Sequence, residues 1–246
     1  RYRASTDGDF SLKDHDTDDD SWFKGDDDEG RALLEELRLD IARLQAKLYA
    51  EGKEKLLIVL QAMDAAGKDS TVRDVLRSTN PMGVHAHAFG RPSSEELAHD
   101  YLWRVHAHTP AAGDITIFNR SHYEDVLVVR VNDLVPKSQW KRRYRHIREF
   151  ERMLVDEGVT IRKFFLNISR EEQREQFQQR LDDPDKRWKF DPRDLEVRAQ
   201  WDDYMEAYED AIRETSTEDA PWFVVPADRR WYRKLAVAEI LLDTLR

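Results

Sequence analysis

Gly67 and Lys68 lie next to each other in the stretch MDAAGKDST, residues 63–71, and this pair is typical of loops that bind phosphate. The usual pattern is G-x-x-x-x-G-K-[ST], in which backbone N–H groups and the lysine surround phosphate oxygens. Here Ala62 stands at the first glycine position, and Asp69 replaces the metal-binding hydroxyl. The pair follows the apolar run LLIVL and precedes a predicted helix at residues 70–77, which is the context in which the motif works. The sequence therefore predicts a phosphate-binding loop made of Ala65, Ala66, Gly67, Lys68, Asp69 and Ser70.

A second group of polar residues follows the predicted strand DITIFN, residues 114–119. In phosphoryl-transfer enzymes with such a loop, the end of a later strand supplies an acid near the magnesium ion. This chain has the neutral Asn119 there, so we expect Asp64, inside the loop, to supply the carboxylate; a hydrogen bond that caps the loop is its alternative role. Arg120 directly follows the strand, where a guanidinium can bind phosphoryl oxygens with two parallel hydrogen bonds.

These residues need a scaffold in which several strands end side by side. Apolar runs predict five strands, within residues 55–61, 84–89, 114–119, 160–168 and 221–227. Helical patterns lie before and between them, including residues 28–52, 93–108 and 231–245. Strands that alternate with helices favour right-handed crossovers and a parallel sheet. We therefore expect an α/β fold, a doubly wound parallel sheet of about five strands with helices on both faces.

The negative charge is distributed unevenly along the chain. The net charge is -10, and residues 1–29 hold 11 acidic and 4 basic side chains, a net of -7. The other 217 residues hold 39 acidic and 36 basic side chains, a net of only -3, so the total does not exclude a polyanionic ligand. We interpret residues 1–29 as a solvated or loosely draped acidic arm, and residues 30–246 as a single domain. A metal-binding loop is the alternative for the arm, although its spacing is not that of an EF-hand.

Composition also excludes several classes of protein. The chain has no cysteine, which excludes disulfides and thiolate sites and suits a reducing cytosol. Its apolar runs are too short to span a membrane, so we expect a cytoplasmic protein. Arg1 stands where a methionine would begin a new chain, which is typical of a trimmed sequence. Six histidines lack zinc-like spacing, and we interpret them as packing or surface residues: His85, His87, His99, His106, His108 and His122.

Four stretches together resemble one known family. They are DAAGKDST, FGRPSSEELAHDYLWRVH, IFNRSHYEDVL and DKRWKFDPRDLEVRAQWDDYMEAYEDAI, and the resemblance runs from about Leu56 to the C-terminus. The family is the second family of polyphosphate kinases. Its members resemble thymidylate kinase, carry a P-loop kinase fold and use inorganic polyphosphate as the phosphoryl donor. An altered loop with Asp64 and Asp69 is typical of this family, so the resemblance implies that the loop is intact.

The resemblance implies roles for individual residues. Asp64 would bind Mg²⁺ or Mn²⁺, and Lys68 would hold the phosphate chain near the transferred group. Asn119 and Arg120 match the family's second motif, in which many members have Asp at the position of Asn119 and Asn at the position of Glu124. The form NRSHYEDV resembles the subgroup that accepts both nucleoside mono- and diphosphates. We therefore expect Asp64, Lys68, Arg120 and Glu124 to be catalytic, and Asn119 to lie on the nucleotide side.

A helical lid is implied at about residues 180–195, in the stretch QREQFQQRLDDPDKRWKFDPRD. In the family, this lid closes over the reacting phosphates. Arg180 and Arg187 are the candidates for stabilising charge in the transition state, and Lys186 and Lys189 are candidates for binding phosphate. A solvated basic turn, balanced by nearby aspartates, is the alternative interpretation.

Two further regions could contact the substrates. The stretch FGRPSSEE follows the second predicted strand, where related nucleotide kinases hold the acceptor, so Phe89 and Arg91 are acceptor-side candidates. The basic helix KSQWKRRYRHIREFERML is either a solvated face or part of an electropositive channel for a polyanion, and its sequence leaves both interpretations open.

The expected activity is reversible transfer of a phosphoryl group from polyphosphate to AMP and ADP. The expected partners are polyphosphate and adenine nucleotides, with guanine nucleotides left open, and neither nucleic acid nor a membrane. The resemblance also implies a homo-oligomer, either a dimer or a tetramer. Two alternatives remain, namely an ATP-dependent kinase for a nucleotide or another small molecule, and a polyanion-binding module without catalytic activity.

Overall fold

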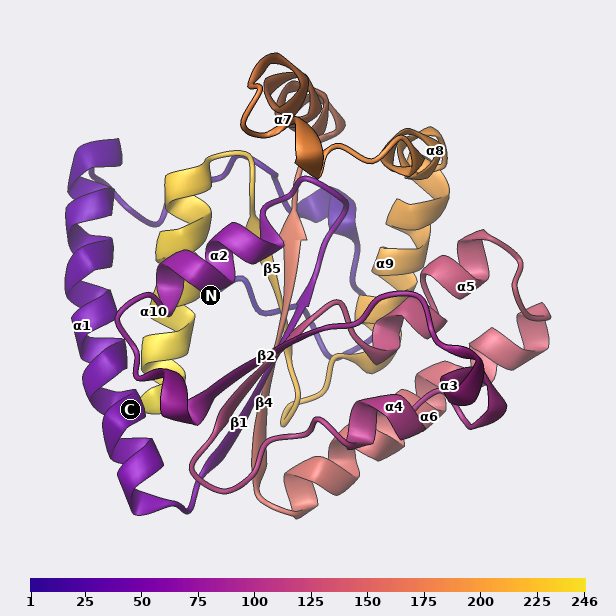
Figure 1. The fold of residues 1–246 in the computed structure, drawn as a ribbon, viewed down its shortest axis with the longest axis horizontal. Coiled ribbons are helices and arrows are strands. Elements are labelled where there is room, and N and C mark those ends of the chain that lie inside the picture. Colours follow the sequence, from indigo (N-terminus) through magenta and orange to yellow (C-terminus); the bar gives the residue numbers. More distant parts are fainter.

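The computed structural model describes residues 1–246 and is built on a five-stranded sheet (Figure 1). The strands are β1 (Lys55–Gln61), β2 (Val84–Ala88), β3 (Ile115–Asn119), β4 (Val159–Asn167) and β5 (Trp222–Pro226). They lie in the order β2-β3-β1-β4-β5, and all four pairings are parallel. The doubly wound parallel sheet predicted from the alternation of strands and helices is therefore confirmed.

Helices cover both faces of this sheet (Figure 1). One face carries α1 (Asp27–Glu51), α2 (Lys68–Val75) and α10 (Arg230–Leu245). The other carries α5 (Val128–Val131), α6 (Lys137–Asp156) and α9 (Trp201–Thr215), with α3 (Ser94–Ala98) and α4 (Trp103–His106) beside α6. At the carboxyl ends of the strands lie α7 (Arg170–Asp182) and α8 (Arg193–Ala199). Four short 3₁₀ helices complete the chain, η1 (Leu12–Asp14), η2 (Pro81–Gly83), η3 (His122–Asp125) and η4 (Arg187–Lys189).

The central strand β1 explains why the site forms where it does. Residues Leu56 to Gln61 are all buried, which fits the continuous apolar run of a strand covered on both faces. The chain leaves β1 toward β3 on one side, whereas β4 and β5 lie on the other. Ligands of open α/β sheets bind in the crevice beyond the carboxyl ends of the strands at such a switch point. The loops that follow β1 and β3 border this crevice.

The helix predicted over residues 93–108 is wrong in its continuity. Ser93 begins α3 with a capping box, because its side chain accepts from the Glu96 N–H and Glu96 accepts in return from the Ser93 N–H. His99 then adopts an extended conformation, and Asp100 accepts a 3.0 Å hydrogen bond from the Leu102 N–H. This local bond competes with the helix, which resumes only as α4.

The acidic N-terminal segment differs from the solvated arm that its composition favours. Arg3 forms an antiparallel bridge with Phe223, so the segment adds to the open edge of β5. The side chains of Phe10 and Leu12 are buried in the core. Arg229 forms ion pairs with Asp18 and Asp20 and offsets part of the acidic charge. The few apolar residues among the aspartates hold the segment on the domain.

None of the helices is both long enough and apolar enough to cross a lipid bilayer.

Candidate active site

The phosphate-binding loop connects β1 to α2 and has an unusual backbone. Ala65 and Gly67 have φ angles of 64° and 91°, both in the left-handed region. Such alternation turns successive N–H groups to one side, which forms a concave site for anions. The helix α2 begins at Lys68, directly after this turn, and the hydroxyls of Ser70 and Thr71 donate to the Gly67 carbonyl. The predicted loop therefore has the geometry of an anion cradle at a helix N-terminus.

Arg233, from α10, forms the floor of this loop. Its guanidinium is buried and donates to Thr71 Oγ1 at 3.0 Å, Ser70 Oγ at 3.2 Å and the Ala227 carbonyl at 3.2 Å. A Cβ atom at Gly67 would lie only 2.4 Å from Arg233 Nη2, so the loop needs glycine there for space as well as for its φ angle. Sequence reasoning missed Arg233, since it follows the loop by more than half the chain.

Lys68 lies inside the loop with its side chain 9% exposed. Its Nζ donates to the Ala62 carbonyl at 2.8 Å and to the Met63 carbonyl at 3.3 Å. Burial lowers the pKa of the ammonium group, while Asp64 opposes this shift. The ammonium group is thus already at the centre of the loop, bonded to carbonyls that an anion can replace.

Asp64 and Arg120 form an ion pair across the crevice, with 2.6 Å between Oδ1 and Nη2. Burial opposes the charge of Arg120, but Glu124 and Asp64 outweigh it and raise the pKa of the guanidinium. Arg120 has a φ of 60°, and the left-handed conformation costs a residue other than glycine about 1–2 kcal/mol. This strain places the guanidinium directly over the phosphate-binding loop.

The two unusual residues of the motifs meet each other. β1 and β3 are neighbours with Leu60 opposite Asn119, so the end of β3 lies beside the loop. There, the Asn119 side-chain amide donates to Asp69 Oδ1. The acid at the end of the loop and the neutral amide at the end of the strand therefore satisfy one another, which explains why both positions depart from the usual pattern together.

Glu124 lies in η3, whose first turn is capped by Ser121. Burial raises the pKa of Glu124, while Arg120, Lys68 and Gln61 favour its charged form. Gln61, at the end of β1, donates to Ser121 Oγ at 3.1 Å, and its buried Oε1 has no hydrogen-bond partner. The structure thus brings Glu124 into electrostatic contact with the predicted Asp64, Lys68 and Arg120.

The region predicted as a lid consists of the end of α7, then η4 and the start of α8 (Figure 1). Arg180 points to Asp194, with 3.4 Å between Nη1 and Oδ2. Burial and Asp64 raise the pKa of Asp194 to about 6, and Arg180 opposes this rise. Asp194 therefore faces the phosphate-binding loop, although the sequence interpretation missed it. Its only signal was its place within the resembling stretch, among many other acids.

The remaining lid residues lie farther from the loop. Arg187 Nε donates to the Leu181 carbonyl at 2.8 Å, and Lys186 pairs with Asp183. Lys189 Nζ lies 5.1 Å from the centre of the exposed Trp188 ring. All these contacts stay within the lid, so a role of these cations at the phosphates requires that the lid moves.

A contact between α7 and the loop was also missed. Gln173 is fully buried, and its Nε2 donates to the Asp64 carbonyl at 2.9 Å. Its Oε1 in turn accepts from Arg198, on α8, at 3.0 Å. The loop is therefore hydrogen-bonded to both helices of the lid region.

The acceptor-side candidates differ from each other in exposure. The Phe89 ring is buried, lies 5.0 Å from the Phe118 ring centre to centre, and is covered by the Arg104 guanidinium at 5.2 Å. Arg91 is exposed in the loop after β2. The packing gives Phe89 a role in holding this loop, and the nucleotide role of both residues stays a prediction.

The residues present fit a divalent metal ion. Asp64 and Asp194 bring two carboxylates together beside the phosphate-binding loop, and each raises the free energy of the other's charged form. No group of three His, Asp or Glu side chains gathers anywhere in the structure. Mg²⁺ is usually bound by one or two carboxylates together with substrate phosphates and water, so two carboxylates are sufficient.

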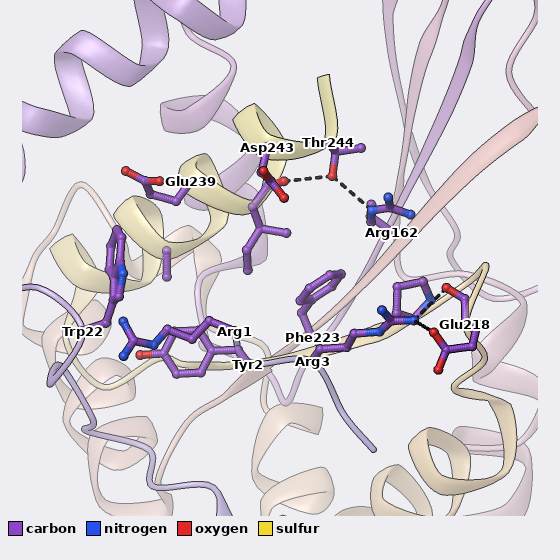
Figure 2. A pocket seen from close by; sticks show the side chains of 13 residues that line it. Arg1, Tyr2, Arg3, Trp22, Arg162, Glu218, Phe223, Glu239, Asp243 and Thr244 are labelled. Carbon is purple, nitrogen blue, oxygen red and sulfur yellow. Dashed lines mark hydrogen bonds and ion pairs between the residues drawn. The ribbon is translucent and has the colours of Figure 1, made fainter. Parts of the chain in front are cut away.

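A separate pocket of about 370 Å³ lies between the N-terminal segment, β5 and α10 (Figure 2). Its charged residues include Arg3, Arg162, Glu218 and Asp243, and Arg162 donates to Thr244 Oγ1 at 3.0 Å. None of the 13 lining residues belongs to the phosphate-binding loop, η3 or the lid.

Comparison with known proteins agrees with this geometry. The family model described as polyphosphate kinase 2 matches residues 24–246. The chain belongs to the polyphosphate kinase 2 family. An AMP/ADP-polyphosphate phosphotransferase of Meiothermus ruber is 59% identical over 245 residues, which cover 100% of this chain and 92% of the relative. An ADP-polyphosphate phosphotransferase of Rhodopseudomonas palustris is 46% identical and covers 85% of this chain and 78% of its own length.

A solved member of the polyphosphate kinase 2 family has nearly the same fold. The crystal structure of polyphosphate kinase 2 from Arthrobacter aurescens matches with a TM-score of 0.96 and 46% identity. The match covers 99% of this chain and 87% of that protein. The resemblance that the four stretches indicated is therefore confirmed over almost the whole chain.

Proposed function

We propose that this protein transfers the terminal phosphoryl group of inorganic polyphosphate to AMP and ADP, and that the reaction is reversible. The observation that carries the proposal is the meeting of Asp64, Lys68 and Arg120 around one anion-binding loop in a polyphosphate kinase 2 chain. The relative from Meiothermus ruber, whose name includes both AMP and ADP, supports the choice of acceptors.

The chemistry of this reaction is mainly electrostatic. An oxygen of the nucleotide's terminal phosphate attacks the end phosphorus of polyphosphate, the bond to the next bridging oxygen breaks, and a chain one unit shorter leaves. Phosphoryl transfer needs in-line positioning and neutralised charge rather than a covalent nucleophile. Lys68 and Arg120 are placed to hold the transferred group, and Arg180 could join them once it leaves Asp194.

Asp64 and Asp194 are the residues that would hold Mg²⁺ or Mn²⁺. When bound, the ion supplies positive charge to the phosphate oxygens, which lowers the repulsion between donor and acceptor. The second carboxylate extends the original expectation, in which Asp64 alone bound the metal.

The test is an assay of nucleotide phosphorylation in which polyphosphate is the only phosphoryl donor. AMP, ADP, GMP and GDP are each incubated with the protein, polyphosphate and Mg²⁺, without added ATP or GTP, and the products are separated by chromatography. We expect ATP from ADP, and ADP and ATP from AMP. Activity only when ATP replaces polyphosphate as donor would indicate the ATP-dependent alternative. Polyphosphate binding without any turnover would indicate the non-catalytic module.

We also propose a homo-oligomer, a dimer or a tetramer, which light scattering in solution tests directly. A monomer at assay concentrations would exclude it.

A further inference from the structure

A cluster of polar side chains lies buried directly behind the η3 segment. It consists of Tyr123 in η3, Glu151 in α6, Lys163 in β4 and Thr215 at the end of α9, and each is at most 2% exposed. None of them faces the phosphate-binding crevice, and the reaction proposed above does not use them. Four separate elements therefore meet at one polar point in an otherwise apolar core.

The hydrogen bonds within this cluster converge on the Tyr123 hydroxyl. It donates to Glu151 Oε1 at 2.7 Å or Thr215 Oγ1 at 2.9 Å, and it accepts from Lys163 Nζ at 3.0 Å. Lys163 also pairs with Glu151 Oε2 at 2.5 Å and donates to the Thr215 carbonyl at 2.7 Å. His122, next to Tyr123 in η3, lies 3.3 Å from Glu151 Oε1. Two consecutive residues of η3 are therefore bound to the same carboxylate.

A buried ion pair is an inefficient way to stabilise a fold. Removing two charges from water has a large desolvation cost, and apolar residues of similar volume are often as stabilising or more so. Burial alone would raise the pKa of Glu151, but Lys163 and His122 outweigh it and lower the pKa, so the carboxylate stays charged. Groups of this kind can instead specify one arrangement of the elements that they connect.

The element that this cluster fixes carries the site. Arg120 and Glu124 lie on either side of Ser121, His122 and Tyr123, and they point toward Asp64 and Lys68. Arg120 is strained, with a φ of 60°, and such a conformation persists only where the surrounding structure determines it. The Val126 and Leu127 N–H groups also donate to the Tyr123 carbonyl, at 2.9 and 3.0 Å, so the turn beyond Glu124 depends on the same residue.

We propose that Tyr123, Glu151 and Lys163 are positioning residues, which hold η3 from behind so that Arg120 and Glu124 face the phosphate-binding loop. This inference rests on the proposed function for its kinetic test. The cluster touches no reacting atom, and it acts only through the backbone of η3.

The first experiment compares two substitutions that each remove one buried hydroxyl. Tyr123→Phe keeps the ring in the core and removes only the hydrogen bonds of the cluster. Tyr232→Phe is the matched control, because Tyr232 is also buried, is bonded to Tyr2, and lies in α10 away from η3. We expect Tyr123→Phe to lower kcat with both AMP and ADP about tenfold or more, since small misplacements of catalytic groups have effects of this size. The control should keep its kcat within twofold at a similar loss of Tm.

The second experiment asks whether Tyr123 acts through Arg120. If it does, adding Tyr123→Phe to Arg120→Ala lowers kcat by no more than about twofold beyond Arg120→Ala alone. Two independent losses that multiply would overturn the proposal, and so would an unchanged kcat in Tyr123→Phe.

Hydrogen exchange provides a readout that needs no activity. Tyr123→Phe should accelerate amide exchange in residues 119–127, and Tyr232→Phe should leave that segment unchanged. Equal exchange in all three proteins would overturn the positioning role whether or not the protein uses polyphosphate. A wild-type protein without turnover, together with faster exchange in Tyr123→Phe, would refute the proposed function and leave the positioning of η3 supported.

Discussion

Replacement of Gly67 by alanine tests the geometry of the phosphate-binding loop most directly. Two separate effects should add up. A φ of 91° strains any residue with a Cβ atom by about 1–2 kcal/mol. The new methyl group would also lie 2.4 Å from Arg233 Nη2, so the guanidinium must move away from Ser70, Thr71 and the Ala227 carbonyl.

The displacement of Arg233 is expensive because the side chain is only 3% exposed. Burial lowers its pKa to about 10, so it remains charged at neutral pH. Leaving a buried polar group without its partner costs about 1–3 kcal/mol, and more when the group is charged. We therefore expect Gly67→Ala to lower the free energy of unfolding by about 3–5 kcal/mol in all.

Gly158→Ala is the control, because Gly158 has a similar φ of 82° and a Cβ atom there would meet no other atom within 4 Å. It should lose only the strain, about 1–2 kcal/mol, and keep its activity. Urea unfolding of the wild type and both variants measures the difference, provided that the m-values agree. Equal losses in the two variants would show that Arg233 does not support the loop, and our account of Gly67 would then be refuted.

Three further predictions concern the site and the N-terminal segment. Lys68→Ala and Asp64→Ala should each lower turnover about 10²–10³-fold without unfolding the protein, as measured by kinetics and circular dichroism, because each removes a positioned charge; a variant with more than half the activity would exclude that residue from the site. Glu124→Asn should lower turnover with AMP much more than with ADP, since AMP places its phosphate one unit farther from the donor and needs a group held by Glu124 to bridge the distance; equal factors with both acceptors would remove this role. Phe10→Ala should destabilise the fold by about 3–5 kcal/mol in urea unfolding with turnover preserved, because Phe10 is buried; a change below about 1 kcal/mol would indicate a solvated arm after all.

The sequence predicted those parts of the fold that depend on local pattern. The continuous apolar run of β1 and the Gly67-Lys68 pair identified a strand, a loop and a helix, because burial on both faces and a tight turn each leave a local signature. The break at His99 was missed, since a single side-chain hydrogen bond from Asp100 ended a helix that has good helical periodicity.

The missed parts of the site depend on contacts between distant segments. Asp194, Gln173 and Arg233 reach the loop from α8, α7 and α10, and nothing in their local sequence distinguishes them from surface residues. The resemblance located the stretch that contains Asp194 but did not show that it faces Asp64. The N-terminal segment was misread for a similar reason, because Phe10 and Leu12 are buried by residues that follow them by most of the length of the chain.

The pairing of α1 with α10 has a consequence for how the chain folds. The two helices pack side by side, although they lie near opposite ends of the described sequence (Figure 1). A ribosome produces α1 long before its partner, so the apolar stripe of Leu34, Leu37 and Ile41 has no surface to cover it until α10 emerges. Contacts of such long sequence separation slow folding, because a large loop must close before they form. The nascent chain should therefore bind chaperones through α1, and release should follow the synthesis of α10.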